Sequence, residues 1–292
     1  MVWAILAALG SSILRAGLNV IDRTAFGHRG AAVIAVNLVN NLLPLVIILP
    51  VSALVSGPGR TMEALGDIRN LWVAGLVQLV AYAFSFAFKG LTISQVIVFS
   101  KLPDVFILIG IYALTLAWSW ADFAFAALTT LVCLPLLVGR GHTSQTRNGR
   151  WWAPGMLMGA VLVRGVFSGS LIQTQGEYHD VWLPITAATL WWRFVWSLVV
   201  LMGSAAVSRR VVWASPGVPL LIGRAVVTLG VQALYVLALA IGPATAVWPI
   251  IDSTALFSTA FSAILLHEHP SRREVAAVLG IVILTLARML YG

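Results

Sequence analysis

The amino-acid sequence predicts an all-α polytopic membrane protein with ten transmembrane helices. Of its 292 residues, 60% are apolar and only 10% are charged, whereas soluble domains carry roughly 25% charged residues. A soluble fold could not cover its surface with so few charges. Apolar stretches of about 20 residues, the length that spans a bilayer, recur along the whole chain, and no linker between them is long enough to separate soluble domains.

Ten apolar segments account for almost the entire chain. The first starts almost at Met1 and lacks a basic leader, so we expect it to be the first helix rather than a cleavable signal peptide. Two joints are very tight, near Gly90 and near Gly242, where glycine or a following proline ends one helix and begins the next. The predicted spans are 3–21, 31–55, 71–89, 92–116, 121–138, 154–173, 182–207, 218–241, 243–266 and 273–291.

The two halves of the chain, 1–140 and 151–292, look like repeats of five helices each. Asn41 in the second span overlays Arg193 in the seventh at an offset of 152 residues, and three further matches have offsets of 149 to 152 residues. Because each half has an odd number of helices, the second half enters the membrane from the opposite side and is inverted relative to the first. Inverted repeats are the usual architecture of secondary transporters, which bind their substrates where the repeats meet.

The C-terminal quarter combines several features of one known family. Positions 238–252 read Ala-Leu-Ala-Ile-Gly-Pro-Ala-Thr-Ala-Val-Trp-Pro-Ile-Ile-Asp; Leu-Leu-His-Glu at 265–268 and Pro-Ser at 270–271 then precede a last helix that contains Gly280. This pattern resembles the EamA-type proteins of the drug/metabolite transporter superfamily. The first half departs from it, with Trp-Ser-Trp at 118–120 and no Glu at the matched helix end. The resemblance implies a transporter, usually an exporter of small metabolites or amino acids, with a central cavity lined by helices of both halves.

Ionisable residues inside the predicted spans are the first candidates for function. A charge near the bilayer centre costs from about 3 to more than 10 kcal/mol, so it is retained only when it is paired or faces a cavity. Lys101 and Asp252 each lie about nine residues, or about 14 Å, into their helices, at corresponding positions of the two halves. We expect them to meet near the midplane, with Asp104 on nearly the same helix face as Lys101. Substrate or proton binding is one role for this group, and a static ion pair that fixes helix register is the alternative.

Arginines add a positive surplus to the interior. Arg15, Arg164 and Arg193 lie in the middle of predicted spans, and Arg224 lies near enough to a span end to snorkel to the interface. Five basic and two acidic residues are then inside the membrane. Such a surplus favours an anionic or zwitterionic ligand, because guanidinium binds carboxylate or phosphate in a bidentate fashion. Neutralisation by helix C-termini and backbone carbonyls is the alternative.

Polar and aromatic residues form shorter patterns on the same helices. Gln78 and Tyr82 share a face of the third span, Gln232 lies on the eighth and Trp248 on the ninth. These four residues are predicted to line the substrate cavity, with ordinary helix–helix contacts as the alternative. Asn41 and its neighbouring asparagines in the second span are predicted to form hydrogen bonds between helices.

Motifs for catalysis and for ATP use are absent from the sequence, which has no phosphate-binding glycine loop, nucleophile elbow or HExxH. We therefore expect no enzyme activity and no cofactor, with a proton or ion gradient, or facilitated diffusion, as the driving force. The basic residues form no dense run, which argues against nucleic acid as a partner. The expected partners are a small-molecule substrate and the lipid bilayer; the oligomeric state stays open, a monomer included.

The predicted function is secondary-active transport of small polar metabolites by alternating access, in a multi-pass protein of the plasma (inner) membrane. Alternatives within transport are a flippase for a lipid-linked phosphate and a transporter of cationic drugs. Outside transport they are a membrane-embedded enzyme and a non-transporting subunit or sensor. Ten basic loop residues on one side against three on the other place both termini outside the cell. The family resemblance implies cytoplasmic termini, so the orientation stays open.

Overall fold

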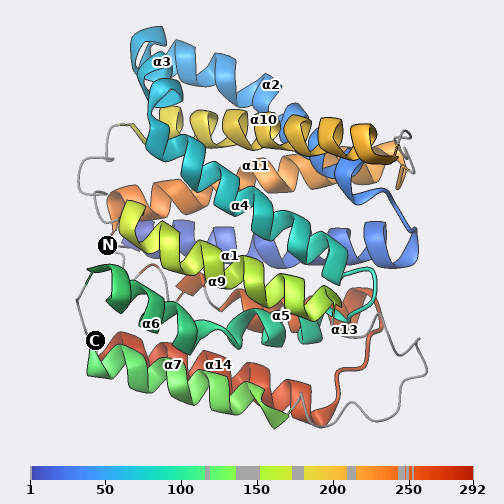
Figure 1. Ribbon diagram of the computed structural model, residues 1–292, viewed down its shortest axis with the longest axis vertical. Helices are drawn as coiled ribbons and strands as arrows, with labels where there is room; N and C mark the ends of the chain where they lie inside the picture. The colour runs from blue at the N-terminus through green and yellow to red at the C-terminus, as the bar shows by residue number, and fades with distance from the viewer. Residues whose placement is uncertain are drawn as a thin grey trace.

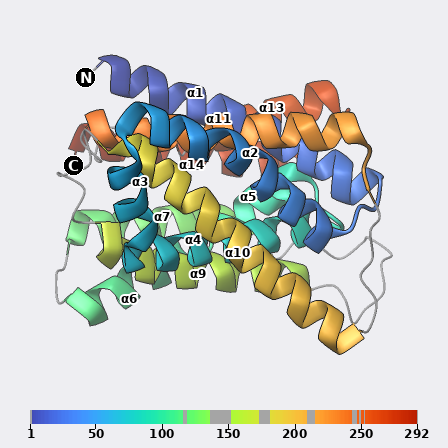
Figure 2. The same cartoon turned by 90° about the horizontal axis from the view of Figure 1, so that it is seen from above.

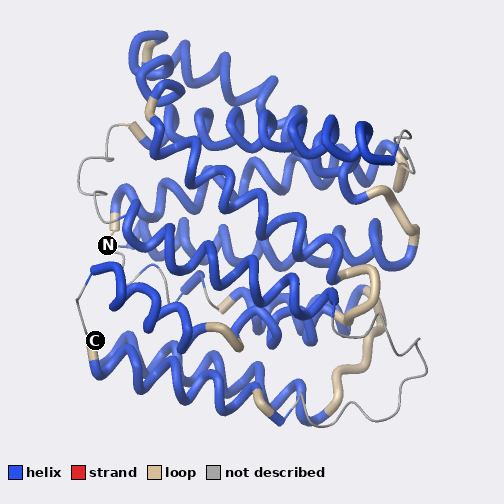
Figure 3. The backbone as a smooth tube through the Cα atoms, viewed as in Figure 1, coloured by secondary structure: helices blue, strands red, loops and turns tan. Residues whose placement is uncertain are grey.

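The computed structural model describes residues 2–115, 119–135, 152–172, 181–208, 215–242, 247, 250–251 and 253–291. All regular secondary structure in these ranges is helical (Figures 1 and 3). The helices are α1 (Val2–Asp22), the π-helix η1 (Arg23–His28), α2 (Val33–Ser56), α3 (Pro58–Gly66), α4 (Ile68–Ala87), α5 (Ile93–Lys101), α6 (Asp104–Thr115), α7 (Trp120–Cys133), α9 (Trp152–Ile172), α10 (Trp182–Ser208), α11 (Val218–Ile241), α13 (Thr254–Leu265) and α14 (Arg272–Tyr291).

Six helical segments in the described part of the chain are long and apolar enough to cross a membrane. They are Val2–His28, Val33–Ser56, Ile68–Ala87, Ile93–Leu114, Trp182–Ala206 and Val218–Ile241. Shorter apolar helices, α7, α9 and α13, overlap further predicted spans. The structure therefore shows an all-helical protein with several candidate membrane spans, as the composition predicts.

Large apolar side chains cover the outside of the helices. Leu54 is 85% exposed, Trp3 76% and Ile283 64%. A soluble protein avoids apolar surface on this scale because it drives aggregation. Lipid tails solvate such side chains, and the helices satisfy their own backbone hydrogen bonds as a bilayer requires. The exposed surface is thus that of a multi-pass membrane protein.

Three helix boundaries differ from the prediction. The first span is predicted to end at residue 21, but the helix continues through a π-helical turn to His28 and so brings Asp22 inside the span. The predicted span 92–116 is matched by the candidate span Ile93–Leu114, but a turn at Leu102–Pro103 divides it into α5 and α6, because proline removes a backbone donor and clashes with the preceding turn. The predicted loop 56–70 contains the additional helix α3.

The helices run between two ends of the molecule, and both termini lie at the same end (Figure 1). The α1–α2, α4–α5 and α13–α14 connections gather at the other end, here called the basic end for its residues Arg23, Arg29, Lys89, Arg272 and Arg273. Seen from above, α1, α11 and α13 lie on one side and α4, α6 and α9 on the other (Figure 2). Helix α10 crosses between them and packs against α2, α4 and α11.

Close helix packing on the α9 side depends on a glycine. A Cβ atom at Gly165 would lie 2.5 Å from Cδ1 and 2.8 Å from Cγ1 of Ile107 on α6. These separations are far below carbon–carbon contact distance. The missing side chain therefore sets how near α6 and α9 approach each other.

Candidate functional site

A buried polar network lies where α2, α4 and α10 meet. Asn41 Nδ2 donates hydrogen bonds to Gln78 Oε1 at 3.0 Å and to Ser197 Oγ at 2.8 Å. Arg193 Nε donates to the same Gln78 oxygen at 3.1 Å. Asn41 Nδ2 also lies 3.4 Å from the backbone oxygen of Arg193. The network joins helices of the first half to a helix of the second half.

Some atoms of this region are buried without a hydrogen-bond partner. They are Asn41 Oδ1, Gln78 Nε2, Tyr82 OH and Arg224 Nη1. The Tyr82 hydroxyl lies beside Ser197 and Gln78 but makes no well-aligned hydrogen bond with either. Each buried polar atom without a partner costs about 1–3 kcal/mol. Groups of this kind are rare in native proteins, and each of them calls for an explanation.

Beside this network lies a buried ion pair between α1 and α11. Arg224 Nε donates to Asp22 Oδ1, and Arg224 Nη2 donates to Asp22 Oδ2 at 3.2 Å and to Asn37 Oδ1 at 3.2 Å. The guanidinium also lies 5.5 Å from the centroid of the Phe26 ring. Arg224 is 3% exposed, so it does not extend to the membrane interface. Asn37 continues the network to Ser85 Oγ at 3.1 Å.

Two further arginines lie around Tyr235 on α11. The guanidinium carbon of Arg15 is 5.9 Å from the centroid of the Tyr235 ring, and Arg164 is in hydrogen-bond contact with this tyrosine. The charges of Arg224, Arg15 and Arg164 all act on Arg193. Arginines from α1, α9, α10 and α11 thus converge in the interior, and we call these four the arginine cluster.

Lys101 and Asp104 form an ion pair across the break between α5 and α6. Lys101 Nζ lies 4.0 Å from Asp104 Oδ2, and the side chains are 21% and 25% exposed. Both lie near Cys133 of α7, which is buried. Asp252 and Trp248 lie outside the described residues. The expected pairing of Lys101 with Asp252 therefore stays a prediction.

Of the other predicted site residues, Gln78, Tyr82 and Arg193 are brought together, and Arg15 and Arg164 meet at Tyr235. Gln232 is buried on α11. The predicted interhelical role of the asparagines is confirmed by the bonds of Asn41 and Asn37 described above.

Two carboxylates hold the start of α5 at the basic end. Glu268, from the α13–α14 connection, accepts hydrogen bonds from Arg23 Nε at 2.7 Å and from Ile93 N at 3.2 Å. Glu274 accepts from Ser94 Oγ at 3.0 Å. A carboxylate at a helix N-terminus satisfies free N–H groups and complements the helix dipole. These bonds, the basic-end latch, tie α5 of the first half to the second half.

Sequence reasoning missed Asp22 and Ser197 as members of the polar network. Asp22 falls one residue beyond the predicted first span, so it was not counted among the interior charges. Ser197 follows Arg193 by four residues on α10, and this helical spacing is the signal that would have found it.

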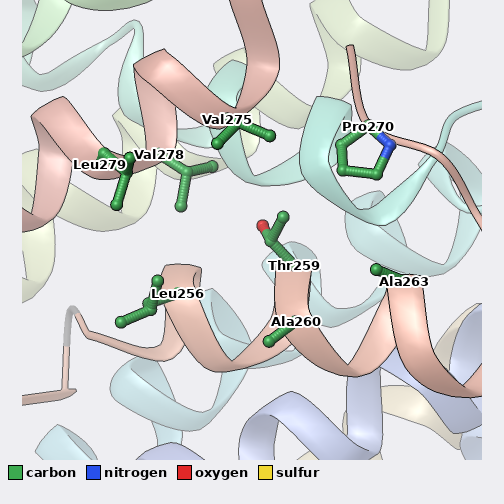
Figure 4. A pocket seen from close by; sticks show the side chains of 8 residues that line it. All are labelled: Leu256, Thr259, Ala260, Ala263, Pro270, Val275, Val278 and Leu279. Atoms are coloured by element: carbon green, nitrogen blue, oxygen red, sulfur yellow. The ribbon is translucent and has the colours of Figure 1, made fainter. Parts of the chain in front are cut away.

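An apolar groove of about 230 Å³ lies between α13 and α14 (Figure 4). Leu256 and Ala260 from α13 and Val275 and Leu279 from α14 are among its lining residues. The hydroxyl of Thr259 donates within its own helix, to Ala255 O at 2.9 Å. Among the described residues that line this groove none is charged, so it does not suit a polar ligand.

No family model and no curated protein matches this chain.

Proposed function

We propose that the protein is a secondary-active transporter of small polar metabolites, organic anions in particular, with ten transmembrane helices arranged as two inverted EamA-like repeats. The observation that carries this proposal is the buried polar centre. Arg193, Gln78 and Asn41 meet there from helices of both halves and are buried in the interior of the bundle. A membrane protein retains charges at such depth chiefly along a substrate or ion path.

The pairing of helices supports the inverted repeat. Three helix pairs pack together: α1 with α11, α9 with α4, and α2 with α10. In the proposed repeat, α1 is equivalent to α9, α4 to α11 and α2 to α10. Exchange of the two halves therefore turns the α1–α11 pair into the α9–α4 pair and leaves the α2–α10 pair unchanged. Asn41 and Arg193, which are 152 residues apart, are in contact, as expected of equivalent positions beside such an axis. The site then lies where the two repeats meet.

The basic-end latch supports alternating access. Glu268 and Glu274 bind the first turn of α5 and hold the two halves together at one end. Exposure of the centre to that end requires these bonds to break. The sequence has no nucleotide-binding motif, so the proposed driving force is a proton or ion gradient, or facilitated diffusion. The basic residues at this end support a cytoplasmic location for it under the positive-inside rule, in a protein of the plasma (inner) membrane.

Transport is tested with the purified full chain in proteoliposomes. We expect uptake or counterflow of labelled organic anions such as succinate or glutamate that is absent from empty vesicles. Arg193→Gln abolishes it. The matched control is Arg69→Gln, which removes an arginine at the surface, where Arg69 pairs with Asp67 at 2.7 Å and so lowers the pKa of Asp67 below its ordinary value. Exclusive uptake of organic cations refutes the anion preference. Movement of fluorescent phospholipids alone supports the flippase alternative.

A further inference from the structure

Three hydrogen-bond donors of the polar centre have no acceptor. They are Gln78 Nε2, Tyr82 OH and Arg224 Nη1, on side chains that are more than nine-tenths buried. The orientation of the Gln78 amide is determined by its neighbours, because its Oε1 accepts from both Arg193 Nε and Asn41 Nδ2. A flipped amide would place two donors against the same N–H groups. The unmatched donor at Gln78 is therefore a property of the network.

Arg193 brings a positive charge to the same place. Its guanidinium donates one hydrogen bond among the described contacts, from Nε to Gln78. The charges that act on it within the described residues are those of other arginines and of Tyr82, with no carboxylate among them. The one carboxylate that the described contacts bring to this region is Asp22, and Asp22 is engaged with Arg224. Among the described residues, Asn41 Oδ1 is the one unpaired acceptor beside the three unpaired donors, so the centre still has donors and positive charge in excess.

We propose that the polar centre binds the oxyanion group of a small acid, a carboxylate or a phosphate, through Arg193, Gln78, Tyr82 and Arg224. This assignment names the substrate class of the transporter proposed above and rests on that function. An oxyanion is an acceptor with several lone pairs, so one group satisfies donors from α4, α10 and α11 and supplies the missing negative charge. A cation would add to the repulsion, and a neutral polyol would leave the charge of Arg193 unbalanced.

The buried donors are also closed to solvent in this conformation. Each unpaired atom is covered by surrounding protein, so ligand access requires a shift of α4 or α11 relative to α10. Such a shift at the site is what a transporter needs between its two open states. Binding and opening are therefore coupled at the same side chains.

A substitution of Tyr82 can distinguish a ligand-binding role of its hydroxyl from a structural one. Its hydroxyl lacks a partner, so Tyr82→Phe removes an unsatisfied buried group and should leave the melting temperature of the ligand-free protein unchanged or raised. The same variant loses one donor to the anion. We therefore expect opposite effects on the ligand-free protein and on ligand binding, whereas a structural hydroxyl would lower the melting temperature and leave binding unchanged.

The experiment is a thermal-shift titration of the purified full chain in detergent at constant ionic strength. The probes are inorganic phosphate, succinate, glycerol and choline, with chloride as the salt control. We expect a concentration-dependent rise of the melting temperature with phosphate or succinate but not with glycerol or choline. The more effective anion identifies phosphate or carboxylate as the recognised group. The apparent affinity should fall by roughly tenfold or more in Tyr82→Phe and Arg193→Gln, and stay unchanged in Arg69→Gln.

Different experimental outcomes would refute the oxyanion site and the transporter function. No anion-specific shift in the wild type, or an undiminished shift in both Tyr82→Phe and Arg193→Gln, overturns the oxyanion site. Uptake of cations by proteoliposomes would then keep the transporter and discard the anion. Anion-specific binding that the variants weaken, without any uptake, keeps the site and refutes transport.

Discussion

The ion pair between Asp22 and Arg224 should be among the most sensitive points of the fold. Both side chains are buried, with exposures of 9% and 4%, and both carboxylate oxygens accept from the guanidinium. Arg224→Met leaves the Asp22 carboxylate in the interior without its counter-charge. Removal of one partner from a buried pair costs about 3–5 kcal/mol. We expect the free energy of unfolding to fall by this amount.

A double-mutant cycle measures the effect. Asp22→Leu alone leaves a buried guanidinium unpaired and should cost a similar amount. In the double variant both charges are gone, and the remaining loss is roughly 1 kcal/mol for Asn37 Oδ1, which no longer has its donor. The coupling energy, which is the sum of the two single losses minus the loss in the double variant, is then at least about 5 kcal/mol. Reversible unfolding in mixed detergent micelles provides the four free energies.

A matched pair at the surface provides the control. Arg69 and Asp67 are also ion-paired, but the arginine side chain is 45% exposed, and Arg69→Met should cost under about 1 kcal/mol. The reasoning is refuted if Arg224→Met costs no more than this control, or if the double variant is as unstable as the two single losses added together.

Three further outcomes follow from the packing and the latch. Glu268→Gln weakens the basic-end latch, so cysteines introduced near the polar centre should react faster with a membrane-impermeant maleimide applied at the basic end; an unchanged rate would show that the latch does not control access. Gly165→Ala should destabilise by about 1–3 kcal/mol through overlap with Ile107, with partial rescue by Ile107→Val. Gly155→Ala, whose Cβ meets nothing within 4 Å, should cost much less. Cys133 is buried and should resist alkylation until the protein is unfolded; rapid reaction of the native protein would contradict its position.

Much of the helical layout follows from the sequence because the bilayer imposes a simple rule. A span needs about 20 apolar residues, and every predicted span overlaps a described helix. The misplaced boundaries have local causes. At Pro103 the missing N–H donor breaks one predicted helix into two, and at Asp22 the helix continues as a π-helix beyond the apolar stretch. A hydropathy profile predicts neither the turn at Pro103 nor the π-helical extension beyond Asp22.

The candidate site was predictable in type but not in arrangement. Arg193, Gln78 and Tyr82 stand out because polar side chains inside spans are rare and expensive. Their hydrogen-bond partners do not stand out. Ser197 is an ordinary hydroxyl on a helix, and Asp22 has the appearance of a residue at a span end. Lys101, Asp104 and Asp252 are predicted to form a polar centre from their depth along the helices and from the corresponding positions of Lys101 and Asp252 in the two halves, and this grouping stays a prediction because Asp252 lies outside the described residues. Depth gives no information on which helix face a neighbour contacts.

The membrane environment, the helical class and the identity of the charged residues inside the spans can be predicted from the amino-acid sequence, because transfer of each residue between water and lipid depends on its own chemistry. Which of those charges meet depends on the tertiary structure. Arg224 forms an ion pair with Asp22, which is 202 residues away in the sequence. Arg193 lies against Gln78 without a described carboxylate partner. Such pairings depend on helix rotation and crossing, which the packing of both halves sets together. The unmatched donors that support the proposed anion site are visible only in the tertiary structure.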